Sequence, residues 1–220
     1  MRQDDVVSVR VWGEYACFTR PELKGERVSY RVMTPSAARG VLESIFWKPE
    51  FSWRVRRIAV LNPIRGFSLM RNEVGGKIAP DAVTRWSETG QRQPYYIDDD
   101  RQQRSTLGLR DVAYQIDAGI HLRGGGSAAE AAKYREQFLR RVEKGQCYTR
   151  PCLGCREFAA HFGPSHPPEA PTAQSEDLGL MLFDMHYDSK AGRYDPVFFE
   201  AVLEGGVLAM PPSLYEEVGL

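Results

Sequence analysis

The alternation of hydrophobic and polar positions along the chain predicts a series of strands. Residues 6–12 (VVSVRVW) are rich in valine, and residues 53–61 and 109–122 alternate apolar and polar side chains as half-buried strands do. Residues 28–33 form a further extended piece, and residues 156–162 can supply a fourth core strand. The intervals between these segments leave room for two helices.

The first helix is predicted to begin after residue 34. Thr34 offers a capping hydroxyl, and Pro35 suits the first helical position because its missing N–H would be unpaired there in any case. Pro49 ends the helical pattern. The apolar side chains with helical spacing, which predict the buried face, are Ala38, Val41, Leu42 and Ile45.

The second helix is predicted over residues 128–144. Ser127 and Glu130 form a capping box ahead of it, and Gly145 closes it. The resulting order, β-α-β-β-α-β, is that of ferredoxin-like domains, which include RNA-recognition domains, so the sequence predicts an α+β, ferredoxin-like fold. The predicted apolar face of this helix consists of Tyr134, Phe138, Leu139 and Val142.

Two parts of the chain fall outside this plan. Residues 66–106 lack a clear period, and we interpret them as a long inserted hairpin. Residues 163–176 are rich in proline and predict a linker, beyond which strand-like segments predict a small antiparallel β-domain. We therefore predict two domains, residues 1–162 and residues 163–220.

The net charge of zero conceals a division within the chain. Residues 1–156 hold 27 basic and 18 acidic residues, a balance of +9, whereas residues 157–220 hold 2 basic and 11 acidic residues, a balance of −9. Of the 29 basic residues, 23 are arginine, which forms forked contacts with phosphate and stacks on bases. The first three-quarters of the chain is therefore predicted to hold RNA, and an arginine-rich surface without such a partner is the alternative.

Several classes of protein are not supported. The longest stretch without a charged residue is 11 residues, well short of a membrane helix, and the N-terminus has no apolar signal segment. The patterns G-x-x-x-x-G-K-[ST], G-x-G-x-x-G, H-E-x-x-H and G-x-S-x-G do not occur. We therefore expect a soluble cytoplasmic protein without membrane contact and without a cofactor.

The cysteines raise the question of a metal. Three of the four fall in the segment CYTRPCLGC, and free thiols in a reducing compartment are the expected state. A zinc site formed by Cys152, Cys155, His161 and His166 is the alternative. Its spacing, C-x2-C-x5-H-x4-H, is shorter than that of the usual structural zinc sites, so no metal is expected.

A glycine-rich turn opens the second predicted helix. Arg123, Gly124, Gly125 and Gly126 precede the capping Ser127. Bare glycine amides together with a helix N-terminus make a natural cradle for phosphate. A flexible connector is the alternative.

Three titratable side chains flank this turn. His121 lies at a predicted strand end, in the most basic part of the chain, and histidine titrates near neutral pH. Lys133 could neutralise a phosphate. Tyr134 fits either a role in proton transfer or the apolar face of the helix, and the helical period favours the core.

Three segments of the chain resemble one family, the CRISPR-associated Cas5 proteins of the d type, which are pre-crRNA endoribonucleases of subtype I-C. The first is VRVWGEYACFTRPELKGERVSYRVMTPSAARGVLESIFWKPEFSW, and the others are LRDVAYQI and PCLGCREF. The resemblance runs from about residue 6 to residue 210, and VMTPSAARGVLESIFWKP is its most specific motif.

The resemblance implies both a fold and an activity. It implies a ferredoxin-like N-terminal domain with an inserted hairpin and a small C-terminal β-domain. It also implies cleavage of CRISPR repeat RNA without metal, by attack of the RNA's own 2′-hydroxyl on the neighbouring phosphate. The protein would then stay on the 5′ handle of the crRNA as part of a Cascade-type complex with other subtype I-C subunits.

The family's catalytic set is a tyrosine, a lysine and a histidine, and this chain departs from it. Phe46 stands at the tyrosine position, and Lys133-Tyr134 stands where the family has lysine and histidine. Phe46 cannot take a proton, and tyrosine, with a pKa of about 10, is a poor base at neutral pH.

Three hypotheses follow from the sequence. The first is an active endoribonuclease, in which Lys133 stabilises the transition state and Tyr134 takes part in proton transfer, with His121 as the next candidate if this pair is not catalytic. The second is a non-catalytic Cascade subunit that binds the crRNA handle, and the third is a general module for RNA or double-stranded DNA. We favour the first because RNA self-cleavage depends heavily on positioning and charge stabilisation. The predicted RNA-binding residues are Arg71, Arg101, Arg104, Arg123 and the three glycines Gly124, Gly125 and Gly126.

Overall fold

The computed structural model describes residues 6–23, 25–92, 94, 96–165, 167, 169–188 and 192–217. Within this part of the chain, nine strands form one sheet in the order β6-β1-β5-β3-β9-β8-β7, and β2 and β4 pair with β5 outside that row. The strands are β1 (Val6–Ala16), β2 (Arg27–Val28), β3 (Phe51–Val60), β4 (Arg65–Val74), β5 (Arg101–Leu122), β6 (His161–Pro164), β7 (Glu176–Asp188), β8 (Arg193–Glu204) and β9 (Val207–Ala209).

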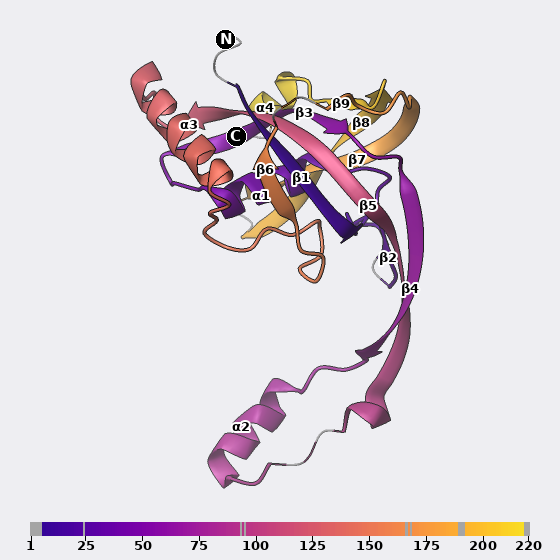
Figure 1. The fold of residues 1–220 in the computed structure, drawn as a ribbon. Helices are drawn as coiled ribbons and strands as arrows, with labels where there is room; N and C mark the ends of the chain where they lie inside the picture. Colours follow the sequence, from indigo (N-terminus) through magenta and orange to yellow (C-terminus); the bar gives the residue numbers. More distant parts are fainter. Residues whose placement is uncertain are drawn as a thin grey trace.

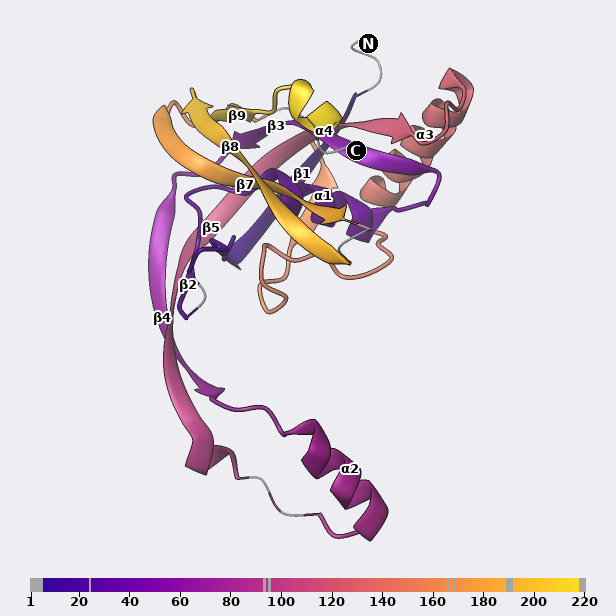
Figure 2. The same cartoon turned by 180° about the vertical axis from the view of Figure 1, so that it is seen from behind.

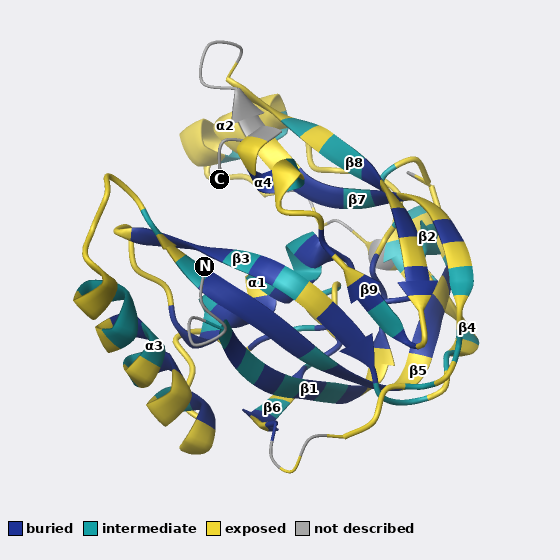
Figure 3. Ribbon diagram, turned by 90° about the horizontal axis from the view of Figure 1, so that it is seen from above, coloured by how far each residue is buried: buried dark blue, intermediate teal, exposed yellow. Residues whose placement is uncertain are grey.

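Two long helices pack against the sheet (Figure 1). These two are α1 (Pro35–Ile45) and α3 (Ala128–Glu143). The other helices are α2 (Pro80–Thr89) and α4 (Ser213–Glu217). The ring of Trp53 in β3 lies 4.7 Å from that of Phe138 in α3, between the sheet and the helices. Figure 3 shows buried positions concentrated on the strands and on the inward side of α3. None of the helices in the described part of the chain is long and apolar enough to span a membrane.

The central strands have the ferredoxin-like arrangement. The four core strands in chain order are β1, β3, β5 and β6, and they lie side by side as β6-β1-β5-β3. Each pair of neighbours is antiparallel, and α1 and α3 connect the strands as the β-α-β-β-α-β plan requires. The predicted fold class is therefore confirmed.

The helix starts match the caps read from the sequence. The hydroxyl of Thr34 accepts a hydrogen bond from the N–H of Ala37 at 3.2 Å, and the hydroxyl of Ser127 accepts one from the N–H of Glu130 at 3.3 Å. The predicted buried face of α3 is correct except for Leu139, which is 39% exposed. Leu139 lies about 100° around the helix from Phe138, past the edge of the buried face.

The long strand β5 is shared between the body of the sheet and a projecting arm. Its second half pairs with β1 and β3 in the body, whereas its first half pairs with β4. β4 and this first half form an arm that projects from the body and carries α2 towards its far end (Figures 1 and 2). The inserted hairpin predicted over residues 66–106 is confirmed. Helix α2 was not predicted, because it buries no side chain and therefore leaves little hydrophobic pattern.

Asp111 marks the point where β5 passes from the arm into the body. Its φ is +53°, in the left-handed region that residues other than glycine seldom adopt. The side-chain amide of Asn62 donates a hydrogen bond to its carbonyl at 2.8 Å. The strand can therefore bend at this residue and change its partner without a glycine.

The fourth core strand differs from the prediction. It was expected over residues 156–162, but β6 spans His161–Pro164 and so includes the start of the predicted linker. Residues 152–159 instead form a turn closed by a bridge between Cys152 and Ala159. This turn lies against the backbone of Cys17, where a β-carbon on Gly154 would come within 1.9 Å of the Cys17 carbonyl.

The C-terminal strands extend the same sheet. β7, β8 and β9 form an antiparallel meander, as expected for the small β-unit, and β9 also pairs with β3. The guanidinium of Arg39 in α1 makes two hydrogen bonds with the buried carboxylate of Asp184 in β7, at 2.6 and 2.8 Å. The division into two domains after residue 162 stays a prediction.

Candidate active site

A shallow cleft lies where the body end of β5 meets the start of α3. His121 lines one side of it, and Gly125, Gly126 and Ser127 line the other. In the sheet, His121 stands opposite Ser52 of β3, and Arg54 is paired with Gly119, two residues before His121. The cleft thus joins a titratable imidazole to the N-terminus of α3.

The cleft favours the neutral form of its histidine. Partial burial, and then the positive charge of Arg54, lower the pKa of His121 below its ordinary value. A histidine with a lowered pKa is largely neutral at neutral pH, and only the neutral imidazole can accept a proton. His121 is therefore suited to act as a general base.

The turn in front of α3 has the backbone conformation that its glycines allow. Gly124 and Gly125 have φ values of +77° and +83°, in the left-handed region. A β-carbon on Gly126 would come within 2.8 Å of the carboxylate of Glu130 and of a methyl group of Leu122. The predicted turn is therefore present, and its backbone lies open beside the helix N-terminus, which favours anions.

The residues at the family's catalytic positions form an aromatic cluster. Tyr134 is 8% exposed, and its ring lies 5.2 Å from that of Phe51 and 6.2 Å from that of Phe46. The hydroxyl of Tyr134 donates a hydrogen bond to Glu130 at 3.3 Å. Burial, and then the carboxylates of Glu50 and Glu130, raise the pKa of Tyr134 above its ordinary value. Tyr134 therefore keeps its proton at neutral pH and belongs to the core.

Lys133 does not line the cleft. It is exposed, and it follows Ala131, which does line the cleft, by two positions, or about 200° around α3. Side chains on a helix lean towards its N-terminus, so the ammonium of Lys133 lies on the far flank of the glycine turn. Lys133 forms no hydrogen bond or ion pair with another described residue.

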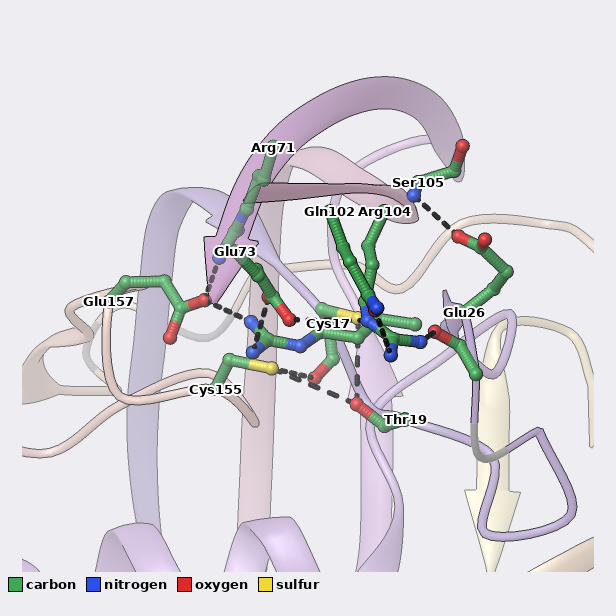
Figure 4. Close-up of polar contacts among 12 residues, drawn as sticks. Cys17, Thr19, Glu26, Arg71, Glu73, Gln102, Arg104, Ser105, Cys155 and Glu157 are labelled. Carbon is green, nitrogen blue, oxygen red and sulfur yellow. Dashed lines mark hydrogen bonds and ion pairs between the residues drawn. The ribbon is translucent and has the colours of Figure 1, made fainter. Parts of the chain in front are cut away.

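Two of the predicted RNA-binding arginines take part in a network at the base of the arm (Figure 4). Arg71 pairs with Glu157, which Arg27 also contacts at 2.7 Å. Arg104 donates to the carbonyl of Gly25 at 2.7 Å. The hydrogen bond from Arg71 lowers the pKa of Glu157. These contacts partly offset the charge of the arginines and tie the arm to the body.

The other two predicted RNA-binding arginines, Arg101 and Arg123, differ in whether their charge is paired. Arg101 pairs with Asp98 near the far end of the arm. Arg123 is exposed at the glycine turn, its N–H donates to the carbonyl of Glu50 at 2.8 Å, and its guanidinium forms no ion pair with another described residue. Arg123 is therefore the member of the set whose charge is available beside the cleft.

Two of the four cysteines, Cys17 and Cys155, lie close together near the base of the arm. Figure 4 shows Cys17, Thr19 and Cys155 close together, and the thiol of Cys155 donates to the carbonyl of Cys17 at 3.6 Å. Interaction with the side chain of Cys17, and not this contact with its carbonyl, lowers the pKa of the Cys155 thiol. Among the described residues, no group of three or more His, Cys, Asp or Glu side chains is placed to hold a metal ion. His166 of the considered zinc set lies outside those residues.

Sequence reasoning missed both the acidic partners of the arginines and two exposed aromatic residues. Glu73 and Glu157 lie far from their partners in sequence, so no local pattern pointed to them. Trp47 and Tyr148 are 50% and 83% exposed. Their neighbours Lys48 and Arg150 were a signal that could have identified them, because aromatic residues interleaved with cations are typical of nucleic-acid surfaces.

A ferredoxin-like body, a hairpin arm between its second and third core strands and an added β-meander together define the architecture of this chain. A solved crystal structure of a CRISPR-associated protein superposes with a TM-score of 0.64 at 22% identity, covering 94% of this chain and 91% of the other. Residues 6–211 match the Cas5d family model, described as CRISPR-associated protein (Cas_Cas5), and the chain belongs to this family.

Two relatives are similar over nearly their whole length. A protein of Thermus thermophilus named CRISPR pre-crRNA endoribonuclease Cas5d is 44% identical, with 96% of this chain and 94% of the relative covered. A protein of Mannheimia succiniciproducens with the same name is 45% identical, with 96% and 97% covered. The resemblance read from the sequence is thereby confirmed.

Proposed function

We propose that this chain is a pre-crRNA endoribonuclease that cuts CRISPR repeat RNA at the cleft beside α3, with His121 as the general base. Two relatives that share more than two-fifths of its residues are named pre-crRNA endoribonucleases. The observation that carries the proposal is a cleft lined both by His121, whose pKa is lowered, and by the N-terminus of α3, so that a proton acceptor lies beside a site that favours anions.

The proposed reaction needs no external nucleophile. His121 accepts the proton of the 2′-hydroxyl, and this oxygen attacks the adjacent phosphorus. The bond to the 5′ oxygen of the next nucleotide breaks, and that oxygen takes up a proton. The products are a 2′,3′-cyclic phosphate and a 5′-hydroxyl.

The charge of the transition state is stabilised around the turn. The backbone of Gly125 and Gly126, the N-terminus of α3 and the guanidinium of Arg123 surround the place of the phosphate. Lys133 adds positive charge from the other flank. Tyr134 has no part in the proton transfer in this proposal, since its hydroxyl stays protonated and packed.

The proposed partners are CRISPR repeat RNA and the mature crRNA, whose 5′ handle the protein would keep within a complex of other subtype I-C subunits. Binding of double-stranded DNA would use the same positive charge. Phe46 and the raised pKa of Tyr134 favour a second candidate, a subunit that binds the handle without cutting it.

One experiment separates the two candidates. The protein is incubated with its own repeat RNA in excess EDTA, and the products are sized and tested for a cyclic phosphate. We expect cleavage at one position, which stops when the 2′-hydroxyl upstream of the cut is replaced by hydrogen. Tight binding of the RNA without cleavage would establish the non-cutting subunit, and strict dependence on a divalent metal would refute the mechanism.

A further inference from the structure

An exposed aromatic pair lies at the C-terminal end of α1, outside the cleft. Trp47 follows the last turn of α1 and is 50% exposed, whereas its neighbour Phe46 is 1% exposed. Tyr148, in the loop after α3, is 83% exposed. Both rings are therefore left exposed to solvent by the packing of the fold. Binding of a partner over them would remove a large apolar surface from water.

The two rings stand on well-anchored backbone that belongs to one surface. The N–H groups of Tyr148 and Thr149 donate to the carbonyl of Ser44 at 2.8 and 3.2 Å. The guanidinium of Arg141 donates to the carbonyl of Ile45 at 2.8 Å. These three donors cap the last turn of α1, which fixes the loop of Tyr148 against the segment that carries Trp47.

The surroundings of the pair are basic. Residues 46–50 and 140–150 together hold five basic and two acidic residues, a balance of +3. Lys48, Lys144 and Arg150 are exposed, and none of them pairs with another described residue. A protein-binding patch of this size would tend to exclude lysine, whereas single-stranded nucleic acid needs both the cations and the flat rings.

The aromatic pair is also continuous with the cleft. Glu50 accepts the N–H of Arg123 at 2.8 Å, which places the segment after α1 beside the glycine turn. Trp47 is three residues before Glu50, a reach of about 10 Å at most. An RNA strand that leaves the cleft past Arg123 would therefore meet Lys48 and Trp47 next, and then Tyr148.

We propose that Trp47 and Tyr148 form a stacking surface for unpaired bases of the RNA that the cleft receives, with Lys48, Lys144 and Arg150 holding the intervening phosphates. The proposal rests on the proposed function, because it takes RNA as the ligand. Stacking on a ring is tolerant of sequence, so this surface strengthens binding without selecting particular bases.

The test uses the intact protein and a repeat RNA that carries a 2′-deoxy nucleotide at the cut, so that binding is measured without cleavage. We expect Trp47→Ala and Tyr148→Ala each to weaken the Kd about five- to thirty-fold, the usual scale for losing one stacked base. The slope of log Kd against log salt should stay unchanged in both, because a neutral ring releases no counterions. Lys48→Ala and Arg150→Ala should instead lower that slope by about one each.

Two controls make the result specific. Trp47→Phe and Tyr148→Phe keep a stacking ring and should restore most of the affinity. Tyr194→Ala removes a ring that is 65% exposed on β8 and should leave the Kd unchanged. Unfolding temperatures of all variants are measured, since both rings are at the surface and their loss should not unfold the chain.

The outcomes distinguish this proposal from the one on which it rests. A Kd that stays unchanged in both alanine variants, in a protein that binds and cuts the unmodified RNA, overturns the stacking surface alone. Failure of the unmutated protein to bind the repeat RNA overturns both proposals.

Discussion

The base of the arm and the start of α3 both carry arginine, yet the surroundings of the guanidinium groups differ between the two places. At the arm, Arg71 and Arg104 lie against Glu157 and Glu73. At the start of α3, Arg123 has no carboxylate partner among the described residues. The comparison teaches that a count of arginines does not locate a nucleic-acid site. What distinguishes the glycine turn is an exposed guanidinium that forms no ion pair with another described residue, beside backbone that Gly124 and Gly125 leave open.

The strongest test of this contrast is the histidine of the cleft. His121→Ala should slow single-turnover cleavage about a thousandfold, within the range expected for loss of a general base. His186→Ala is a matched control, because His186 lies on β7, away from the cleft. A normal cleavage rate for His121→Ala would show that the cleft is not the active site.

The same histidine predicts a pH profile. Its pKa lies below the ordinary 6.5 or so, because burial and Arg54 disfavour the charged form. The neutral base therefore increases as pH rises through the lowered pKa. The cleavage rate should rise with it and level off before about pH 6.5. A rate that keeps rising to pH 9 would point to a tyrosine or a lysine instead.

The next effect concerns Lys133. Lys133→Ala should slow cleavage about tenfold at most and change the Kd only a few-fold, because Lys133 does not line the cleft and its charge acts on the transition state only from a distance. Tyr134→Phe keeps the packing against Phe46 and Phe51, and it should cleave at the normal rate. A slow but folded Tyr134→Phe variant would return the proton transfer to Tyr134.

A smaller effect distinguishes the two groups of arginines directly. Arg123→Ala should weaken RNA binding several-fold and lower the salt slope by about one, as loss of one phosphate contact does. Arg71→Ala should leave the salt slope unchanged and lower the Tm by about 2–4 °C, corresponding to about 1 kcal/mol for a partly exposed ion pair. A changed salt slope in Arg71→Ala would mean that the arm also binds phosphate.

The smallest expected change is in thiol chemistry. Because the side chain of Cys17 lowers the pKa of Cys155, a larger fraction of this thiol is ionised at pH 7 than of an ordinary cysteine. Iodoacetamide should therefore modify Cys155 faster than the exposed Cys147 at this pH, as peptide mass spectrometry can measure. Equal rates would show that the interaction with Cys17 does not hold in solution.

The fold was largely readable from local patterns, whereas the site was only partly so. The caps at Thr34 and Ser127 and the period of the strands act over a few residues, so the sequence predicted α1, α3 and the ferredoxin-like order. The pairings of Arg71 with Glu157 and of Arg39 with Asp184 join residues 86 and 145 positions apart. Such pairs form only once the sheet has folded, and they determine which basic side chains remain available for RNA.

The arm also has a consequence for how copies of the protein meet one another. It is a two-stranded ribbon, and within the described residues it pairs further only with β2, at Thr106 and Leu107, and with the end of β1, at Leu109 and Arg110. Long open edges of this kind invite association with strands of other molecules. The charged side chains along the ribbon, Arg65, Arg71, Glu73, Arg101, Arg104 and Arg110, oppose such contacts. Replacing them with apolar residues should therefore cause the protein to aggregate before it loses its fold.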